Sequence, residues 1–267
     1  MVGGRAAARY GRTVLAAAAL VPDTVLLLPG AAGRGPDDPV LLALRAGAAT
    51  AVARAVGGAC RVVVVAPGRT HRSVTGVVRA GAASAGVPDH LLDVEVPDVA
   101  LTAAPGAPPA APGRPGAGAV VGLRLALDAG VPPAAVHVVE VAPGPAGVLR
   151  ATGADLVAAG PTALVVVGSG SARHGADAPL PHDVRADAFD TALLAALRAG
   201  GDAARAAFAD LDAARSAALA VTGWAPWQVL VGAAEVGTAS ARCTTDVVHA
   251  AVWRGAAHAA VVWEVAP

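Results

Sequence analysis

The fold prediction rests on the stretch Ala163–Asp190, which reads A-L-V-V-V-G-S-G-S-A-R-H-G-A-D-A-P-L-P-H-D-V-R-A-D-A-F-D. Its apolar, β-branched beginning predicts a buried strand over Thr162–Val167. The chain then turns on Gly168-Ser169-Gly170-Ser171 and enters a helix predicted over Val184–Ala199. In open α/β sheets, ligands bind beyond the carboxyl ends of the strands. His174 therefore lies where a binding site is expected.

Strand and helix patterns alternate through the first two thirds of the chain. Further strands are predicted over Val14–Val21, Arg61–Val65 and Val136–Val141. Two β-rich runs, Cys243–Trp253 and His258–Val265, predict an antiparallel pair at the C-terminal end. We therefore expect an α/β fold, a three-layer sandwich with a mainly parallel central sheet and a C-terminal antiparallel strand pair.

The domain prediction is a single domain over residues 13–267, preceded by an N-terminal extension over residues 1–12. Inside this domain, Ala103–Gly118 is rich in Pro, Gly and Ala and is predicted to be a poorly packed inserted loop. Pro67–His90 is predicted to be a long loop, followed by a strand over Leu92–Val96.

The composition excludes several classes of function. The formal net charge is 0 and the isoelectric point is about 7.1, so no overall field attracts nucleic acid or an anionic membrane. All the basic charge comes from Arg, because the chain has no Lys. Its two cysteines form no close-spaced metal or redox motif. We expect no nucleic-acid or membrane partner and a cytoplasmic location; a signal peptide near Val14 fits less well than a first strand.

The turn Gly168–His174 resembles the G-x-G-G-x-x-H turn of class III extradiol ring-cleavage dioxygenases of the catalytic B-subunit type, with Ser171 in place of the last glycine. The sequence G-W-A-P-W-Q over Gly223–Gln228 is similar to an actinobacterial branch of that superfamily. The resemblance covers most of the chain from about Thr13 onward. It implies that His174 is the catalytic acid/base.

The same resemblance implies a degenerate iron site. The family holds Fe(II) with two His and one carboxylate. The first His follows a Pro after the first strand, where this chain has Asp23, and the second follows a Pro after the second strand, where it has Gly68. The third ligand is a late Glu, with no anchored counterpart here. We expect no metal cofactor; the alternative is Fe(II) or another divalent ion at a rebuilt site with Asp23, His71 and a late Glu.

The remaining pocket prediction collects polar and aromatic residues near the expected strand ends. The predicted pocket residues are Asp23, Gly68, Arg69, His71, Ser169, Ser171, His182, Trp227 and Gln228. Several candidates also have a structural alternative. His174 could be satisfied by neighbouring groups, the two serines could form the turn, and Trp227 could serve packing. His258 lies in a strand pattern without a partner in the sequence.

Three functions remain open at this point. The first is a non-iron pocket protein of this superfamily that binds an unknown small molecule. The second is an active metal-dependent extradiol-type oxygenase that cleaves an aromatic diol with an unusual ligand set. The third is a structural partner protein that forms a homo-oligomer. Metal analysis of the purified protein separates the first from the second.

Overall fold

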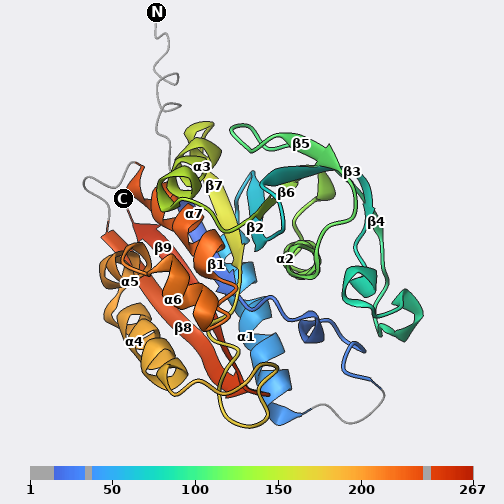
Figure 1. Ribbon diagram of the computed structural model, residues 1–267. Helices are drawn as coiled ribbons and strands as arrows, with labels where there is room; N and C mark the ends of the chain where they lie inside the picture. Colours follow the sequence, from blue (N-terminus) through green and yellow to red (C-terminus); the bar gives the residue numbers. More distant parts are fainter. Residues whose placement is uncertain (1–14, 34–37, 237–241, 267) are drawn as a thin grey trace, which may run out of the picture.

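The structure, a computed structural model, describes residues 15–33, 38–236 and 242–266 (Figure 1). The predicted extension over residues 1–12 lies outside this range. Within it, nine strands form a single sheet. The strands are β1 (Leu15–Val21), β2 (Val62–Pro67), β3 (Arg72–Arg79), β4 (Asp98–Leu101), β5 (Ala110–Pro112), β6 (Val136–Val141), β7 (Thr162–Val167), β8 (Arg242–Trp253) and β9 (Ala256–Ala266).

The sheet is mixed, so the expectation of a mainly parallel sheet is wrong. Its strand order is β4-β3-β6-β2-β7-β1-β9-β8, with β5 paired to β3. The central strands β6, β2, β7 and β1 run parallel, and this part confirms that Arg61–Val65, Val136–Val141 and Thr162–Val167 share one sheet. Antiparallel pairs flank them on both sides. The predicted C-terminal antiparallel pair is present as β8 and β9.

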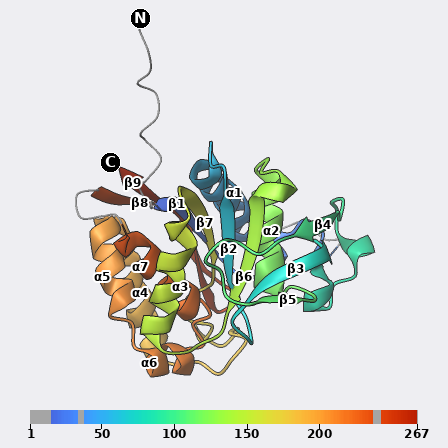
Figure 2. The same cartoon turned by 90° about the horizontal axis from the view of Figure 1, so that it is seen from above.

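Helices cover both faces of the sheet. They are α1 (Pro39–Val56), α2 (Ala117–Asp128), α3 (Ala146–Ala158), α4 (Arg185–Ala199), α5 (Gly201–Ala209), α6 (Ala213–Ala218) and α7 (Trp224–Glu235). Short 3-10 helices span Val25–Leu27, Ala82–Ala85, Asp89–Leu91 and Pro133–Ala135. Figure 2 shows α1 and α2 on one side of the sheet, with α3, α4, α5 and α7 on the other.

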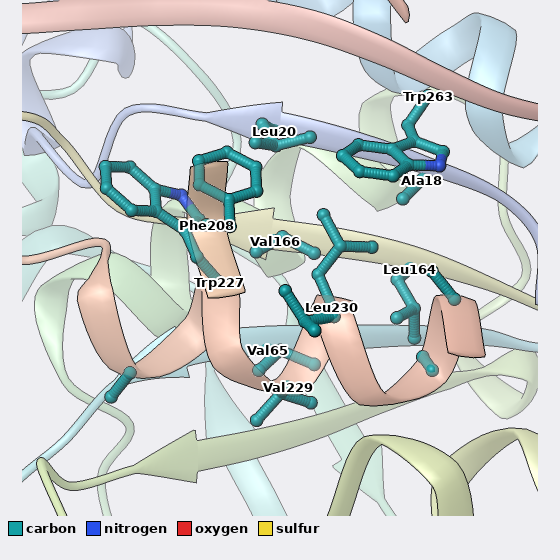
Figure 3. Close-up of a cluster of buried hydrophobic side chains, with 14 of the residues drawn as sticks. Ala18, Leu20, Val65, Leu164, Val166, Phe208, Trp227, Val229, Leu230 and Trp263 are labelled. Atoms are coloured by element: carbon teal, nitrogen blue, oxygen red, sulfur yellow. The ribbon is translucent and has the colours of Figure 1, made fainter. Parts of the chain in front are cut away.

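The valine-rich strands explain this arrangement. In β2, Val63 and Val65 belong to the core under α3, α4, α5 and α7, whereas Val62 and Val64 belong to the core under α1 and α2. A strand that is buried on both faces has no polar side to show, and its sequence is therefore continuously apolar. Figure 3 shows one of these cores, in which Trp227, Leu230 and Val229 of α7 lie over the strands.

Helix α1 is the one described helix that is long and apolar enough to cross a membrane, judged by length and composition alone. It packs against β1, β8 and β9 and buries Leu44, Ala48 and Val52. This is the packing of a core helix and is consistent with a soluble protein.

The segment between β2 and α2 differs from the prediction. The expected loop over Pro67–His90 contains β3, whose strand pattern is weakened by Gly76 and by exposed residues at the edge of the sheet. The expected strand over Leu92–Val96 is a series of bends, in which Leu92 packs into a small separate core. The inserted segment Ala103–Gly118 is not without structure, because it contains β5 and the first two residues of α2.

Candidate functional site

The site is built where two neighbouring parallel strands send the chain to opposite faces. Strand β1 leads to α1 on one face, and β7 leads to α4 on the other. Such a change of side opens a crevice beyond the carboxyl ends of the strands. Asp23 follows β1 and Ser169 follows β7, and the Ser169 hydroxyl donates to Asp23 Oδ1 at 2.6 Å. This hydrogen bond joins the segments that follow the two strands.

His174 is held between two carboxylates of α4. Its Nδ1 lies 2.7 Å from Asp187 Oδ1, and its Nε2 lies 2.7 Å from Asp190 Oδ2. The His174 side chain is 5% exposed and that of Asp190 is 13% exposed, whereas Asp187 is 79% exposed. The contact with Asp187 is therefore the one that water or a ligand can replace at low cost.

The two contacts of His174 fix the number of protons in this group. Each nitrogen–oxygen contact needs one proton, so Asp187, His174 and Asp190 together hold two. Burial raises the pKa of Asp190, and the hydrogen bond from His174 opposes that rise. The backbone N–H of Ser171 also donates to Asp190, at 3.1 Å. The turn after β7 and the first half of α4 are thus joined in one hydrogen-bonded network.

A second histidine, His258 at the start of β9, faces the same region. Its Nδ1 lies 3.2 Å from Ser169 Oγ. Because the Asp23 carboxylate only accepts, the Ser169 hydroxyl points to Asp23, and Ser169 Oγ accepts from His258 Nδ1–H. Burial lowers the pKa of His258, although the nearby Asp23 charge acts in the opposite direction. Neutral His258 therefore keeps Nε2 as an acceptor, with no hydrogen-bond partner among the described residues.

His174 and His258 line a common cavity of about 250 Å³. The rest of its wall is largely apolar and comes from α4, α5, α7 and the β1, β8 and β9 strands. Residues of this wall include Leu20, Thr191, Leu194, Leu197, Phe208, Trp227, Ala251 and Val261. The Phe208 and Trp227 rings stack with centroids 5.0 Å apart, and Figure 3 shows them beside Leu20. The buried indole N–H of Trp227 has no partner among the described residues.

Gly68 shows why the second family ligand has no room here. A Cβ on Gly68 would lie 2.7 Å from the Cβ of Glu140, a distance that side chains do not reach. Glu140 is 5% exposed and accepts from Arg72 Nε at 2.7 Å and from the Gly116 N–H at 2.5 Å. The buried Glu140 side chain is thus fixed against the place where a histidine side chain would begin.

The rebuilt metal site is not assembled either. His71 Nε2 lies 3.1 Å from Thr152 Oγ1 of α3, and burial lowers the pKa of His71. Asp23 lies toward α2 on the other face, since a Cβ on Gly118 would be 3.2 Å from the Asp23 Cβ. In the described part of the chain, no group of three or more His, Cys, Asp or Glu side chains could hold a metal ion. The residues at the family positions therefore do not fit Fe(II).

Other predicted pocket residues lie apart from the cavity. Gln228 is fully buried and bridges Arg150 Nε and the Phe208 carbonyl, so it serves packing between helices. The Ser171 hydroxyl donates to the Leu219 carbonyl at 2.8 Å and shapes the turn. His182 is exposed and accepts from the Gly175 N–H, and Arg69 lines a different cavity together with Gly68.

Sequence reasoning did not find His258, Asp187 or Asp190. The spacing of His174, Asp187 and Asp190 was available as a signal, because carboxylates three residues apart share one face of a helix. That face points back to the turn after β7. The partner of His258 comes from 89 residues away in sequence, and only the pairing of β1 with β9 brings the two together.

The fold and site define an α/β protein with a mixed sheet and a histidine-lined cavity at a strand crossover. No protein-family model matches the chain, and no curated protein matches it. Among solved structures, it is similar to the crystal structure of the uncharacterized protein JW3007 from Escherichia coli K12, with 14% identity and a TM-score of 0.51. The match covers 93% of this chain and 99% of that chain. At this identity the likeness concerns the fold alone.

Proposed function

We propose that this chain is a divergent relative of the class III extradiol dioxygenase catalytic subunits that binds a small, mainly apolar molecule without iron. The observation that carries the proposal is the pair His174 and His258 on one cavity. In this proposal the protein is cytoplasmic, needs no cofactor and has neither nucleic acid nor membrane as a partner.

The cavity supports a ligand with one ring and one or two hydroxyl or carbonyl groups. An apolar cavity of about 150 Å³ is enough for benzene, and this one is about 250 Å³. Its apolar wall favours a ring. Of its two histidines, one offers a hydrogen-bond donor to the ligand and the other offers an acceptor. His174 offers an N–H once a ligand oxygen replaces Asp187, and His258 Nε2 accepts a proton.

This pairing supports proton transfer as the chemistry. A general base needs a free lone pair, which neutral His258 has, and a general acid needs a proton close to the ligand, which the His174 network holds. The Asp23–Ser169 hydrogen bond fixes the ring of His258 in the tautomer that leaves Nε2 free. Tautomerisation or isomerisation of an enol or phenol is the class of reaction that such a pair carries out without a metal.

The test compares phenol, catechol and benzene as probes of the full-length protein. Quenching of tryptophan fluorescence reports binding, since Trp227 forms part of the wall. We expect phenol and catechol to bind, and His174→Gln and His258→Gln each to weaken them about tenfold while leaving benzene unaffected. The matched control is His90→Gln, an exposed histidine outside the cavity. Unchanged affinity for phenol and catechol in both cavity variants would refute the proposal.

The metal part of the proposal has its own experiment. The purified protein is expected to contain no stoichiometric iron, and Fe(II) supplied under anaerobic conditions is expected to give no ring cleavage of catechol after oxygen is admitted. A transition ion bound by Asp23 with His71 or His174 would instead establish the metal-dependent oxygenase.

A further inference from the structure

A second cavity, separate from the histidine cavity, opens beyond the ends of β2 and β6. It has a volume of about 480 Å³. Its described lining consists of Pro67, Gly68, Arg69, Thr70, Arg72, Ser84, Arg114, Gly116, Ala117 and Glu140. Three of these residues are arginines and one is acidic. In a chain with a formal net charge of 0, this is a local excess of positive charge.

The single acidic residue in this lining, Glu140, already has a hydrogen-bond partner on each carboxylate oxygen. One Glu140 oxygen accepts from Arg72 Nε at 2.7 Å, and the other accepts from the Gly116 N–H. Among the described residues, neither the Arg69 nor the Arg114 guanidinium has an ion pair or hydrogen bond, and both side chains are exposed. Two of the three positive charges are therefore unbalanced within the described part of the protein.

One of the three arginines, Arg72, is held in place by its contacts. Arg72 is 19% exposed, and its NH2 group donates to the Arg114 carbonyl at 2.8 Å, which ties the two segments together. Arginine presents planar donors that match phosphate and carboxylate oxygens in pairs. A fixed Arg72 with two free arginines at the rim can thus surround an oxyanion from several sides.

We propose that this cavity binds the doubly charged phosphate group of a small molecule. Arg69 and Arg114 are the recognition residues, and Arg72 positions Arg114 through its backbone carbonyl. A dianion neutralises the two unbalanced charges, whereas a monocarboxylate leaves one of them. The volume is sufficient for a phosphate together with a small organic group. This inference does not depend on the function proposed for the histidine cavity.

The experiment is isothermal titration calorimetry on the full-length protein with inorganic phosphate, phenyl phosphate, succinate and acetate. Inorganic phosphate and phenyl phosphate separate a site for the free ion from a site for an ester. We expect saturable binding of at least one phosphate compound that is tighter than binding of acetate. The affinity should fall as salt is added, because rim charges are screened.

The decisive variant is Arg69→Ala/Arg114→Ala, which removes both free guanidiniums and breaks no described side-chain contact. We expect its Kd for phosphate to rise at least about tenfold. Arg198→Ala, an exposed arginine on α4, is the matched control and should leave the Kd unchanged. Circular dichroism verifies that all variants are folded. The proposal is overturned if the wild-type protein shows no saturable phosphate binding, if acetate binds as tightly, or if the double variant retains the wild-type Kd.

Discussion

The histidine cavity and the arginine cavity lie at the same edge of the parallel core, and they differ in whether their charged groups are paired. In the histidine cavity, beyond β7 and β1, the ionisable groups are paired, as in Asp187–His174–Asp190, and His174 and Asp190 are largely buried. In the arginine cavity, beyond β2 and β6, Arg69 and Arg114 are exposed and have no side-chain partner among the residues that the structure describes. Strands β7 and β2, one from each cavity, are neighbours with similar valine-rich sequences, so the difference arises in the loops that follow.

The loops differ because of what packs behind them. After β7, the chain turns across α4, whose carboxylates Asp187 and Asp190 reach back to His174. After β2, the chain turns directly into β3, an edge region with Glu140 as the nearest buried acid. The strand end that α4 covers, after β7, suits groups that exchange protons. The more open strand end, after β2, suits exposed charges that bind a ligand of opposite charge. The position of the second family ligand, Gly68, falls on the open side.

The largest effect is expected from Trp227→Ala, which removes one wall of the histidine cavity. Trp227 is 4% exposed and stacks on Phe208, so truncation should lower the free energy of unfolding by about 3–5 kcal/mol. Urea denaturation measures this change. Val148→Ala, at a site 57% exposed on α3, is the control and should have little effect. A cost below about 1 kcal/mol would mean that the wall is not a packed core.

The next effect tests whether position 68, beside the arginine cavity, has space for a side chain such as the histidine that the resembling dioxygenases have there. Gly68→Ala places a Cβ 2.7 Å from the Glu140 Cβ, and we expect a loss of about 1–3 kcal/mol from overpacking. Gly147→Ala is a matched control, since no atom lies within 4 Å of its Cβ position. If both substitutions have the same small effect, there is space for a side chain at residue 68 and the iron argument fails.

Much of the fold followed from local patterns, and the reason is the valine content of the central strands. Val136–Val141 and Thr162–Val167 have no polar face, which only a doubly covered strand tolerates. Strand β3, which lies between β4 and β6, was missed because its Gly76 and exposed positions resemble a loop. The position of His174 was also predicted from the turn after β7. Its function as an acid/base stays a prediction.

The network around the site could not be predicted in the same way. Ser169 Oγ is joined to His258 across 89 residues and to Asp23 across 146. Such contacts depend on which strands become neighbours. No local sequence pattern indicates that β9 pairs with β1. The sequence around Gly68 likewise gives no indication that the Glu140 side chain lies against it.

A pH measurement distinguishes the buried histidine from exposed ones. The folded-state pKa of His258 lies below its ordinary value of 6.5 because of burial. Below pH 6.5 the unfolded chain therefore binds a proton that the folded chain resists, and stability falls as the pH decreases. We expect His258→Gln to flatten this part of the stability curve. His71 has a pKa shift of the same sign, so the wild-type and variant curves must be compared by difference. Identical slopes would contradict a neutral buried His258.

The smallest effect is expected in the arginine cavity, and it completes the comparison. Arg69 is exposed and has no described side-chain contact, so Arg69→Ala should change the free energy of unfolding by no more than about 0.5 kcal/mol. Removing a charge that is unbalanced within its cavity relieves repulsion from Arg72 and Arg114, which makes a slight stabilisation the expected sign. Urea denaturation at low salt, where surface charges are least screened, measures it. A loss above about 1 kcal/mol would show that Arg69 supports the fold and is not held free for a ligand.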